Sequence, residues 1–106
     1  MSGRAARVRN HGLVAGLIEE LPDGGYRFTY EPGYGGPAIS LTLPVRAEPY
    51  AAASLFPFFH GLLSEGSTRA LQHRALRIDE DDAFGLLLAT GGDTVGSVTI
   101  EPLAAP

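Results

Sequence analysis

The chain has 106 residues, of which 44% are apolar, and a formal net charge of −4. This size and composition fit one compact domain over residues 1–106, and the acidic balance argues against direct binding of nucleic acid, because neutralising phosphates requires positive charge. Cysteine is absent, which excludes disulfides, thiolate metal sites and a cysteine nucleophile.

All eight basic residues are arginine, and the sequence contains no lysine. Kinases and P-loop proteins generally place a lysine on the nucleotide phosphates, and Schiff-base enzymes need the amine itself. The composition therefore argues against each of these enzyme classes.

The first residues, MSGRAARVRN, are basic and lack the apolar run of a signal peptide. No segment reaches the length of a transmembrane helix either. We therefore expect a cytoplasmic protein with no membrane contact. The arginines at 4, 7 and 9 are interpreted as a solvated terminus, with residues 1–6 flexible.

A β-hairpin is the first element that the pattern predicts. Residues 26–30 alternate aromatic and polar side chains at period two, after an apolar stretch at 14–21. Asp23-Gly24 between them supplies the backbone angles of a tight turn. Gly12 and Gly16 are predicted to mark a bulge or a place where another element approaches the backbone.

Two further strands are predicted from alternation. Ile39, Leu41 and Leu43 alternate with hydroxyl residues, which indicates a half-buried strand after a glycine-rich loop at 31–37. Residues 97–100 repeat the pattern near the end of the chain. Clean alternation is typical of antiparallel sheets with one solvated face.

Between these strands the apolar spacing becomes helical. A first helix is predicted from about Ser54 to Gly66, and a second from residue 67 to about residue 77. A third helix is predicted with Asp79 as N-cap, acids at 80–82 in its first turn, and an apolar body that ends at Gly91-Gly92. The predicted fold class is α+β: a twisted antiparallel sheet of four or five strands with two or three helices on one face.

The pattern offers no credible catalytic, metal or cofactor site. The histidines at 11, 60 and 73 have no helical spacing to one another or to an acid cluster, as a zinc site would need. No G-x-S-x-G elbow is present. The Gly91-Gly92-Asp93 turn precedes a strand, whereas phosphate loops precede a helix. An enzyme acting at the Gly33–Gly36 loop stays open as an alternative, although no nucleophile or base can be named for it.

Three segments resemble a known family. Residues 58–66 read FFHGLLSEG, residues 81–100 read DDAFGLLLATGGDTVGSVTI, and residues 37–44 read PAISLTLP. Their order is similar to that of the N-terminal subdomain of the HipA-type serine/threonine kinase toxins, in which an FFxGLLPEG helix precedes a GGD turn and a strand. Ser64 stands where that family usually has proline.

In the full-length toxins a kinase body follows this subdomain, whereas this sequence stops at Pro106. The resemblance therefore implies a standalone, HipS-like antitoxin that binds and restrains a HipA- or HipT-like kinase in a three-component toxin–antitoxin module linked to bacterial persistence. A HipB-like helix-turn-helix DNA-binding antitoxin is a possible third partner. The alternative is a separately encoded structural subdomain of such a kinase, without an inhibitory role.

The candidate partner-binding residues are His60, Ser64, Glu65 and Gly66. His60 follows the Phe58-Phe59 pair on the polar edge of the first helix, with Ser64 one turn later. In the resembled family the position of His60 carries varied side chains, which suits a residue that faces a partner. An ordinary half-exposed histidine and a solvated Glu65 are the competing interpretations.

Overall fold

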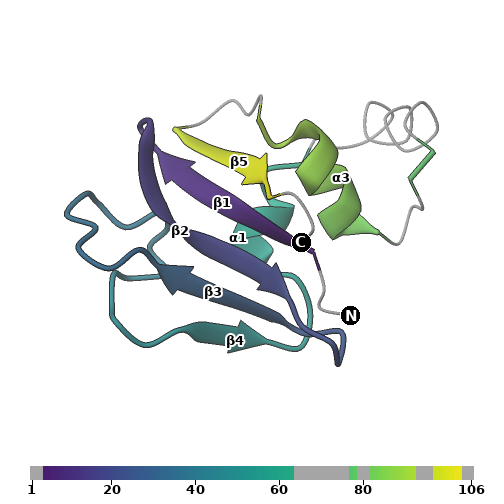
Figure 1. Cartoon of the computed structure of the whole chain (residues 1–106), viewed down its shortest axis with the longest axis horizontal. Coiled ribbons are helices and arrows are strands. Elements are labelled where there is room, and N and C mark those ends of the chain that lie inside the picture. Colours follow the sequence, from purple (N-terminus) through teal and green to yellow (C-terminus); the bar gives the residue numbers. More distant parts are fainter. Residues whose placement is uncertain (1–3, 64–76, 79–81, 93–96, 104–106) are drawn as a thin grey trace.

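A computed structural model of the chain describes residues 4–63, 77–78, 82–92 and 97–103. These residues form a small α+β domain with a five-stranded antiparallel sheet in the order β4-β3-β2-β1-β5 (Figure 1). Neither helix in the described residues could cross a membrane. The elements are β1 (Ala5–Asn10), β2 (Leu13–Glu20), β3 (Tyr26–Tyr30), β4 (Tyr50–Ala52), α1 (Pro57–His60), α3 (Ala83–Thr90) and β5 (Val98–Pro102).

The core lies between the helices and one face of the sheet. Phe28 of β3 is fully buried, and its ring lies 5.7 Å from the ring of Phe59 in α1. Two residues earlier in the strand, Tyr26 makes an edge contact with Phe84 of α3 at 5.4 Å. Because alternate residues of a strand point to the same face, both helices contact the same side of β3.

The predicted hairpin is confirmed. It consists of β2 and β3, joined by a turn in which Gly24 has φ of 90°. The predicted close approach at Gly16 is also present, because a Cβ there would lie 2.4 Å from the Thr29 carbonyl oxygen and 2.9 Å from the Phe28 ring. A register shift between β1 and β2 falls beside this glycine. Gly16 thus lets the Phe28 ring lie directly over β2.

The strand predicted over residues 39–43 is wrong. Ser40 and Leu43 form an isolated bridge closed by a tight turn, and Leu41 is fully exposed instead of sharing a buried face with its neighbours. The cause is the buried hydroxyl of Tyr30, which donates to the Leu43 carbonyl and accepts from the Ile39 amide at 3.1 Å. These bonds replace the ladder partners that a strand would need.

Helix α1 begins later than predicted, at Pro57 instead of Ser54. Proline fits the first helical position because its missing N–H needs no partner there, and it holds the preceding residue in an extended conformation. Phe56 accordingly has φ of −56° and ψ of 139°. The described helix ends at His60 with Gly61 as C-cap, and the predicted stop at Gly66 lies outside the described residues.

Helix α3 matches the predicted apolar body and its end at Gly91, but its N-cap is Asp82 and not Asp79. The Asp82 carboxylate accepts a hydrogen bond from the Gly85 amide at 3.0 Å, which satisfies one of the free donors of the first turn. Phe84, Leu86 and Leu87 are buried. The predicted second helix, residues 67 to about 77, lies almost wholly outside the described residues.

We expect Tyr30→Phe to lower the free energy of unfolding by about 1 to 3 kcal/mol, because it leaves two buried backbone groups without a partner. Urea unfolding measures this change. Tyr50→Phe is the matched control: its hydroxyl also binds a carbonyl, that of Pro44 at 2.6 Å, but in an exposed setting, so its cost should stay within about 1 kcal/mol. Equal losses in the two variants would contradict the role given to the buried hydroxyl.

Candidate functional site

Of the residues predicted for partner contact, the structure places His60. It is the last residue of α1 and its side chain is exposed. The structure gives its imidazole no hydrogen-bond partner within the described ranges. Ser64, Glu65 and Gly66 lie outside those ranges, so their grouping with His60 stays a prediction.

The position of His60 is fixed by the residue before it. Phe59 is fully buried and packs against the rings of Phe58 at 5.3 Å, Phe28 at 5.7 Å and Phe56 at 6.0 Å. Successive side chains on a helix are about 100° apart, so a buried Phe59 turns His60 away from the sheet. The His60 amide also donates to the Phe56 carbonyl at 3.1 Å. The exposed imidazole therefore stands on a firmly held backbone.

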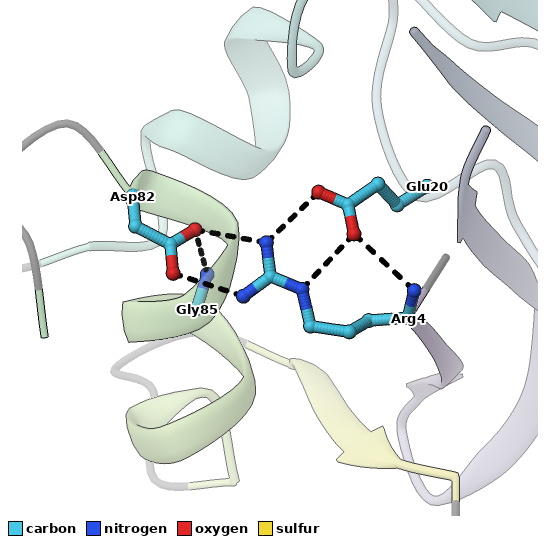
Figure 2. Close-up of polar contacts among 4 residues, drawn as sticks. All are labelled: Arg4, Glu20, Asp82 and Gly85. Atoms are coloured by element: carbon cyan, nitrogen blue, oxygen red, sulfur yellow. Dashed lines mark hydrogen bonds and ion pairs between the residues drawn. The ribbon is translucent and has the colours of Figure 1, made fainter. Parts of the chain in front are cut away.

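Arg4 is held between two carboxylates from distant parts of the chain (Figure 2). Its guanidinium donates to the Glu20 oxygens at 3.0 and 2.8 Å and to the Asp82 oxygens at 2.9 Å each. Asp82 is also the N-cap of α3. One arginine thus joins the start of β1, the end of β2 and the beginning of α3.

This arrangement corrects the expectation for the N-terminus. Residues 1–6 are predicted to be flexible, but Ala5 and Ala6 lie in β1, while residues 1–3 lie outside the described residues. The Arg4 side chain is partly exposed, as predicted for a solvated arginine, but it also makes two ion pairs. The hydrogen bond from Arg4 lowers the pKa of Glu20, against the opposing effect of burial. The bonds to Glu20 and Asp82 raise the pKa of Arg4. We interpret the group as structural, because its donors and acceptors already bind one another.

Gly85 is required by the same contacts. A Cβ at this position would lie 2.1 Å from Asp82 Oδ2 and 2.9 Å from Arg4 Nη1. Although alanine normally favours a helix over glycine, a methyl group here would displace the carboxylate from both the guanidinium and the helix amide. The glycine after Phe84 is therefore a packing requirement.

The sheet face turned away from the helices carries paired charges. Arg7 and Arg9 both contact Glu101, at 3.0 and 3.4 Å, and Arg27 contacts Glu19 at 3.1 Å. The bond from Arg7 lowers the pKa of Glu101. Exposed pairs of this kind contribute little stability. They leave this face nearly balanced in charge, without the basic excess that a nucleic acid would need.

The glycine-rich loop at residues 31–37 is held in place by hydrogen bonds of its own residues. The Tyr34 hydroxyl donates to the Pro37 carbonyl at 2.6 Å and accepts from the Asn10 amide at 3.2 Å. Gly33 has φ of 82°, in the turn closed by the Tyr34 amide and the Glu31 carbonyl. These contacts hold the loop against the end of β1.

A shallow open hollow of about 370 Å³ lies between the β2–β3 turn and β4, lined by Leu21, Asp23, Gly25 and residues 51–53. Its one carboxylate, that of Asp23, accepts a hydrogen bond from the Gly25 amide at 2.9 Å. Within the described residues, no cluster of three or more histidine, aspartate or glutamate side chains could hold a metal ion.

The comparisons with known proteins give the family. The sequence profile described as the HipA N-terminal domain matches residues 6–101, which span the sheet from β1 to β5. The chain belongs to this family. A solved structure, the N-terminal domain of HipA toxin, is similar with a TM-score of 0.76 at 32% identity, covering 97% of this chain and 95% of that chain.

Two relatives carry this domain in chains of different length. A Haemophilus influenzae protein, named only as uncharacterized, is 36% identical over 98 residues, which are 92% of each chain. The Sinorhizobium fredii protein called Putative kinase Y4mE is 32% identical over an alignment of 106 positions that covers 96% of this chain and 25% of that protein. The chain thus spans about a quarter of Y4mE and nearly all of the Haemophilus protein.

We expect Arg4→Met to lower the free energy of unfolding by about 1 kcal/mol at pH 7, a small value because the ion pairs are partly exposed. Since the pKa of Glu20 is lowered in the fold, the contribution is present above about pH 5 and is lost as the pH falls through that lowered pKa. Urea unfolding at pH 7 and pH 3 measures the difference from wild type.

Arg46→Met is the control for this pH dependence. Arg46 donates to backbone carbonyls, those of Glu48 and Pro49, and lies 3.6 Å over the Tyr50 ring. Its loss should change stability equally at the two pH values. An Arg4 effect that is equally independent of pH would contradict the ionic role of the contacts.

Proposed function

We propose that this protein is an antitoxin that binds a HipA- or HipT-like serine/threonine kinase toxin and inhibits it by protein contact. The observation that carries the proposal is the occurrence of this domain both in a chain of about this length and as a quarter of a kinase-named chain. A domain found in both settings is suited to act in trans on a kinase to which it is elsewhere covalently joined.

The described residues favour inhibition by binding over inhibition by an enzymatic reaction. The chain has no lysine for a nucleotide phosphate, and the charged groups around Arg4 form ion pairs with one another. The domain would occupy the position that the N-terminal subdomain takes beside the nucleotide-binding lobe of the kinase. We assign the contact to the exposed end of α1 at His60, with Ser64, Glu65 and Gly66 beside it.

In this proposal the complex is cytoplasmic, where the kinase has access to ATP. A HipB-like helix-turn-helix antitoxin would be the third member and would supply the contact with DNA, which the acidic charge of this chain does not favour. The second candidate function is structural completion of a separately encoded kinase. It is favoured by the membership of the family itself, since the domain is a normal part of such kinases.

A kinase assay separates the two functions. A HipA-like kinase recovered with this protein in a pull-down is incubated with radiolabelled ATP, with and without the protein, over a range of molar ratios. We expect label incorporation by the kinase to fall, with a limit near one protein per kinase. Activity that stays unchanged or rises on adding the protein would support structural completion and reject inhibition. The protein alone should incorporate no label, and reproducible incorporation by pure protein would reject both functions.

The end of α1 should separate stability from binding. Phe59→Ala should lower the free energy of unfolding by about 3 to 5 kcal/mol, because the ring is fully buried. His60→Ala should leave stability within about 0.5 kcal/mol of wild type, because its side chain is exposed, and should weaken binding to the kinase. Thermal melts and a binding titration measure the two effects.

The assignment of His60 fails on either of two results. A His60 variant that melts as early as the Phe59 variant would show a structural role. One that binds the kinase as wild type does would remove His60 from the interface.

A further inference from the structure

The described surface has one large apolar side chain that is completely open to solvent. Leu41 is 101% exposed, whereas the other exposed large apolar residues, Leu13, Val45 and Leu103, are 59%, 45% and 37% exposed. A single exposed leucine on a soluble protein is common and carries no meaning by itself. What distinguishes Leu41 is that the residues before and after it are held by hydrogen bonds.

The turn that carries Leu41 is closed by its own polar groups. The Leu43 amide donates to the Ser40 carbonyl at 3.1 Å, and the Thr42 amide donates to Ser40 Oγ at 3.2 Å. The Ser40 and Thr42 hydroxyls are also hydrogen-bonded to each other at 2.9 Å. The turn therefore has a defined shape, with its apolar tip outward.

The two residues that flank this turn fix it to the core. Ile39 and Leu43 are buried, with 7% and 4% of their surfaces exposed. The Tyr30 hydroxyl binds the backbone of both, accepting from one amide and donating to the other carbonyl. Leu41 thus projects from a turn whose two flanking residues are both hydrogen-bonded to Tyr30, a buried side chain of β3.

The chain that follows is held as well. The Tyr50 hydroxyl donates to the Pro44 carbonyl at 2.6 Å, and the Arg46 guanidinium donates to the carbonyls of Glu48 and Pro49 at 3.1 Å each. The central carbon of the Arg46 guanidinium also lies 3.6 Å from the centre of the Tyr50 ring. Figure 1 shows the loop between β3 and β4 at the left-hand end of the sheet, beside the turn between β1 and β2.

An apolar side chain on a preformed loop is suited to binding. Ordering a loop at an interface costs free energy, and a loop that is already ordered avoids this cost. A few residues that enter well-packed pockets on the partner contribute most of the binding energy of an interface. The preformed turn beneath Leu41 has no evident use for the core, because Ile39 and Leu43 provide the buried contacts.

We propose that Leu41 is an anchor residue that enters an apolar pocket on the kinase. The inference rests on the proposed function. The kinase is the occupant because this domain makes up 25% of Y4mE, so in a kinase-named chain it is covalently joined to about three times its own length of further polypeptide. The open sheet face is a poorer docking surface, since its charges are paired with one another.

The test compares Leu41→Ser with Leu103→Ser in a binding titration against the HipA-like kinase recovered with this protein in a pull-down. Leu103 is also exposed but follows β5 at the opposite end of the sheet, where its amide binds the Ala5 carbonyl. Leu41→Ser should raise the dissociation constant at least tenfold, because the buried leucine surface is lost. Leu103→Ser should change it less than threefold, and both variants should melt as wild type.

Tyr30→Phe tests the preformed turn separately. It keeps Leu41 and removes the two hydrogen bonds that hold the turn. The dissociation constant should therefore lie between those of wild type and Leu41→Ser. Binding by Tyr30→Phe equal to that of wild type would reject the contribution of the held backbone.

Other results reject the anchor or the function distinctly. Wild type and Leu41→Ser that bind the kinase equally would reject the anchor and leave the proposed function standing. Wild type that does not bind the kinase would reject both. A change on Leu41→Ser in the sedimentation of the isolated protein, with kinase binding unaltered, would show a contact between copies of this chain and reject the kinase as occupant.

Discussion

The structure depends on the aromatic face of β3. Tyr26 packs against Phe84 of α3, Phe28 against Phe59 of α1, and Tyr30 against Phe28 at 4.9 Å and Tyr34 at 5.8 Å. One five-residue strand therefore orients both described helices and the loop that follows it. Large rings contribute strongly to a small core because each buries much apolar surface and has preferred edge-to-face contacts.

The aromatic rings of β3 can pack in this way only because β2 has a glycine, Gly16, below the Phe28 ring. Gly16 lies opposite Tyr30 in the sheet and under the Phe28 ring, where any side chain would overlap both the ring and the Thr29 carbonyl. The adjacent register shift between β1 and β2 accommodates an extra residue without losing the pairing on either side. The packing of the aromatic residues of β3 therefore depends on the glycine at position 16 of β2.

The sequence predicted what strong local periodicity determines and missed what distant contacts determine. Alternation over residues 26–30 and 97–100 gave β3 and β5 correctly. Alternation over residues 39–43 predicted a strand that does not form, because the Tyr30 hydroxyl of β3 hydrogen-bonds to the Ile39 amide and the Leu43 carbonyl. The ion pairs of Arg4 are with Glu20, 16 positions later in the sequence, and with Asp82, 78 positions later. No local pattern can indicate contacts over such separations. The alternation of alanine and valine with arginine in β1 is a local signal of a strand with one buried face.

The candidate site was less accessible to sequence reasoning, because exposure to solvent imposes no periodicity. His60 departs from the apolar spacing of its helix, and the structure shows that its side chain is exposed. Its contact with a partner stays a prediction. The alternation of Leu41 with Ile39 and Leu43 predicts a buried side chain, whereas the structure exposes it. Only the tertiary structure separates an apolar residue in the core from one held out of it.

Both exposed elements are attached to the same strand. Phe59, the residue before His60, packs on Phe28, and Tyr30 holds the turn that carries Leu41. Phe28 and Tyr30 are two residues apart on one face of β3 and their rings are in contact. A partner that touched both elements would therefore meet a spacing set by the core and not by flexible surface loops. In the proposed function this makes inhibition sensitive to core packing, because a shift of the β3 rings would move the two contact elements relative to each other.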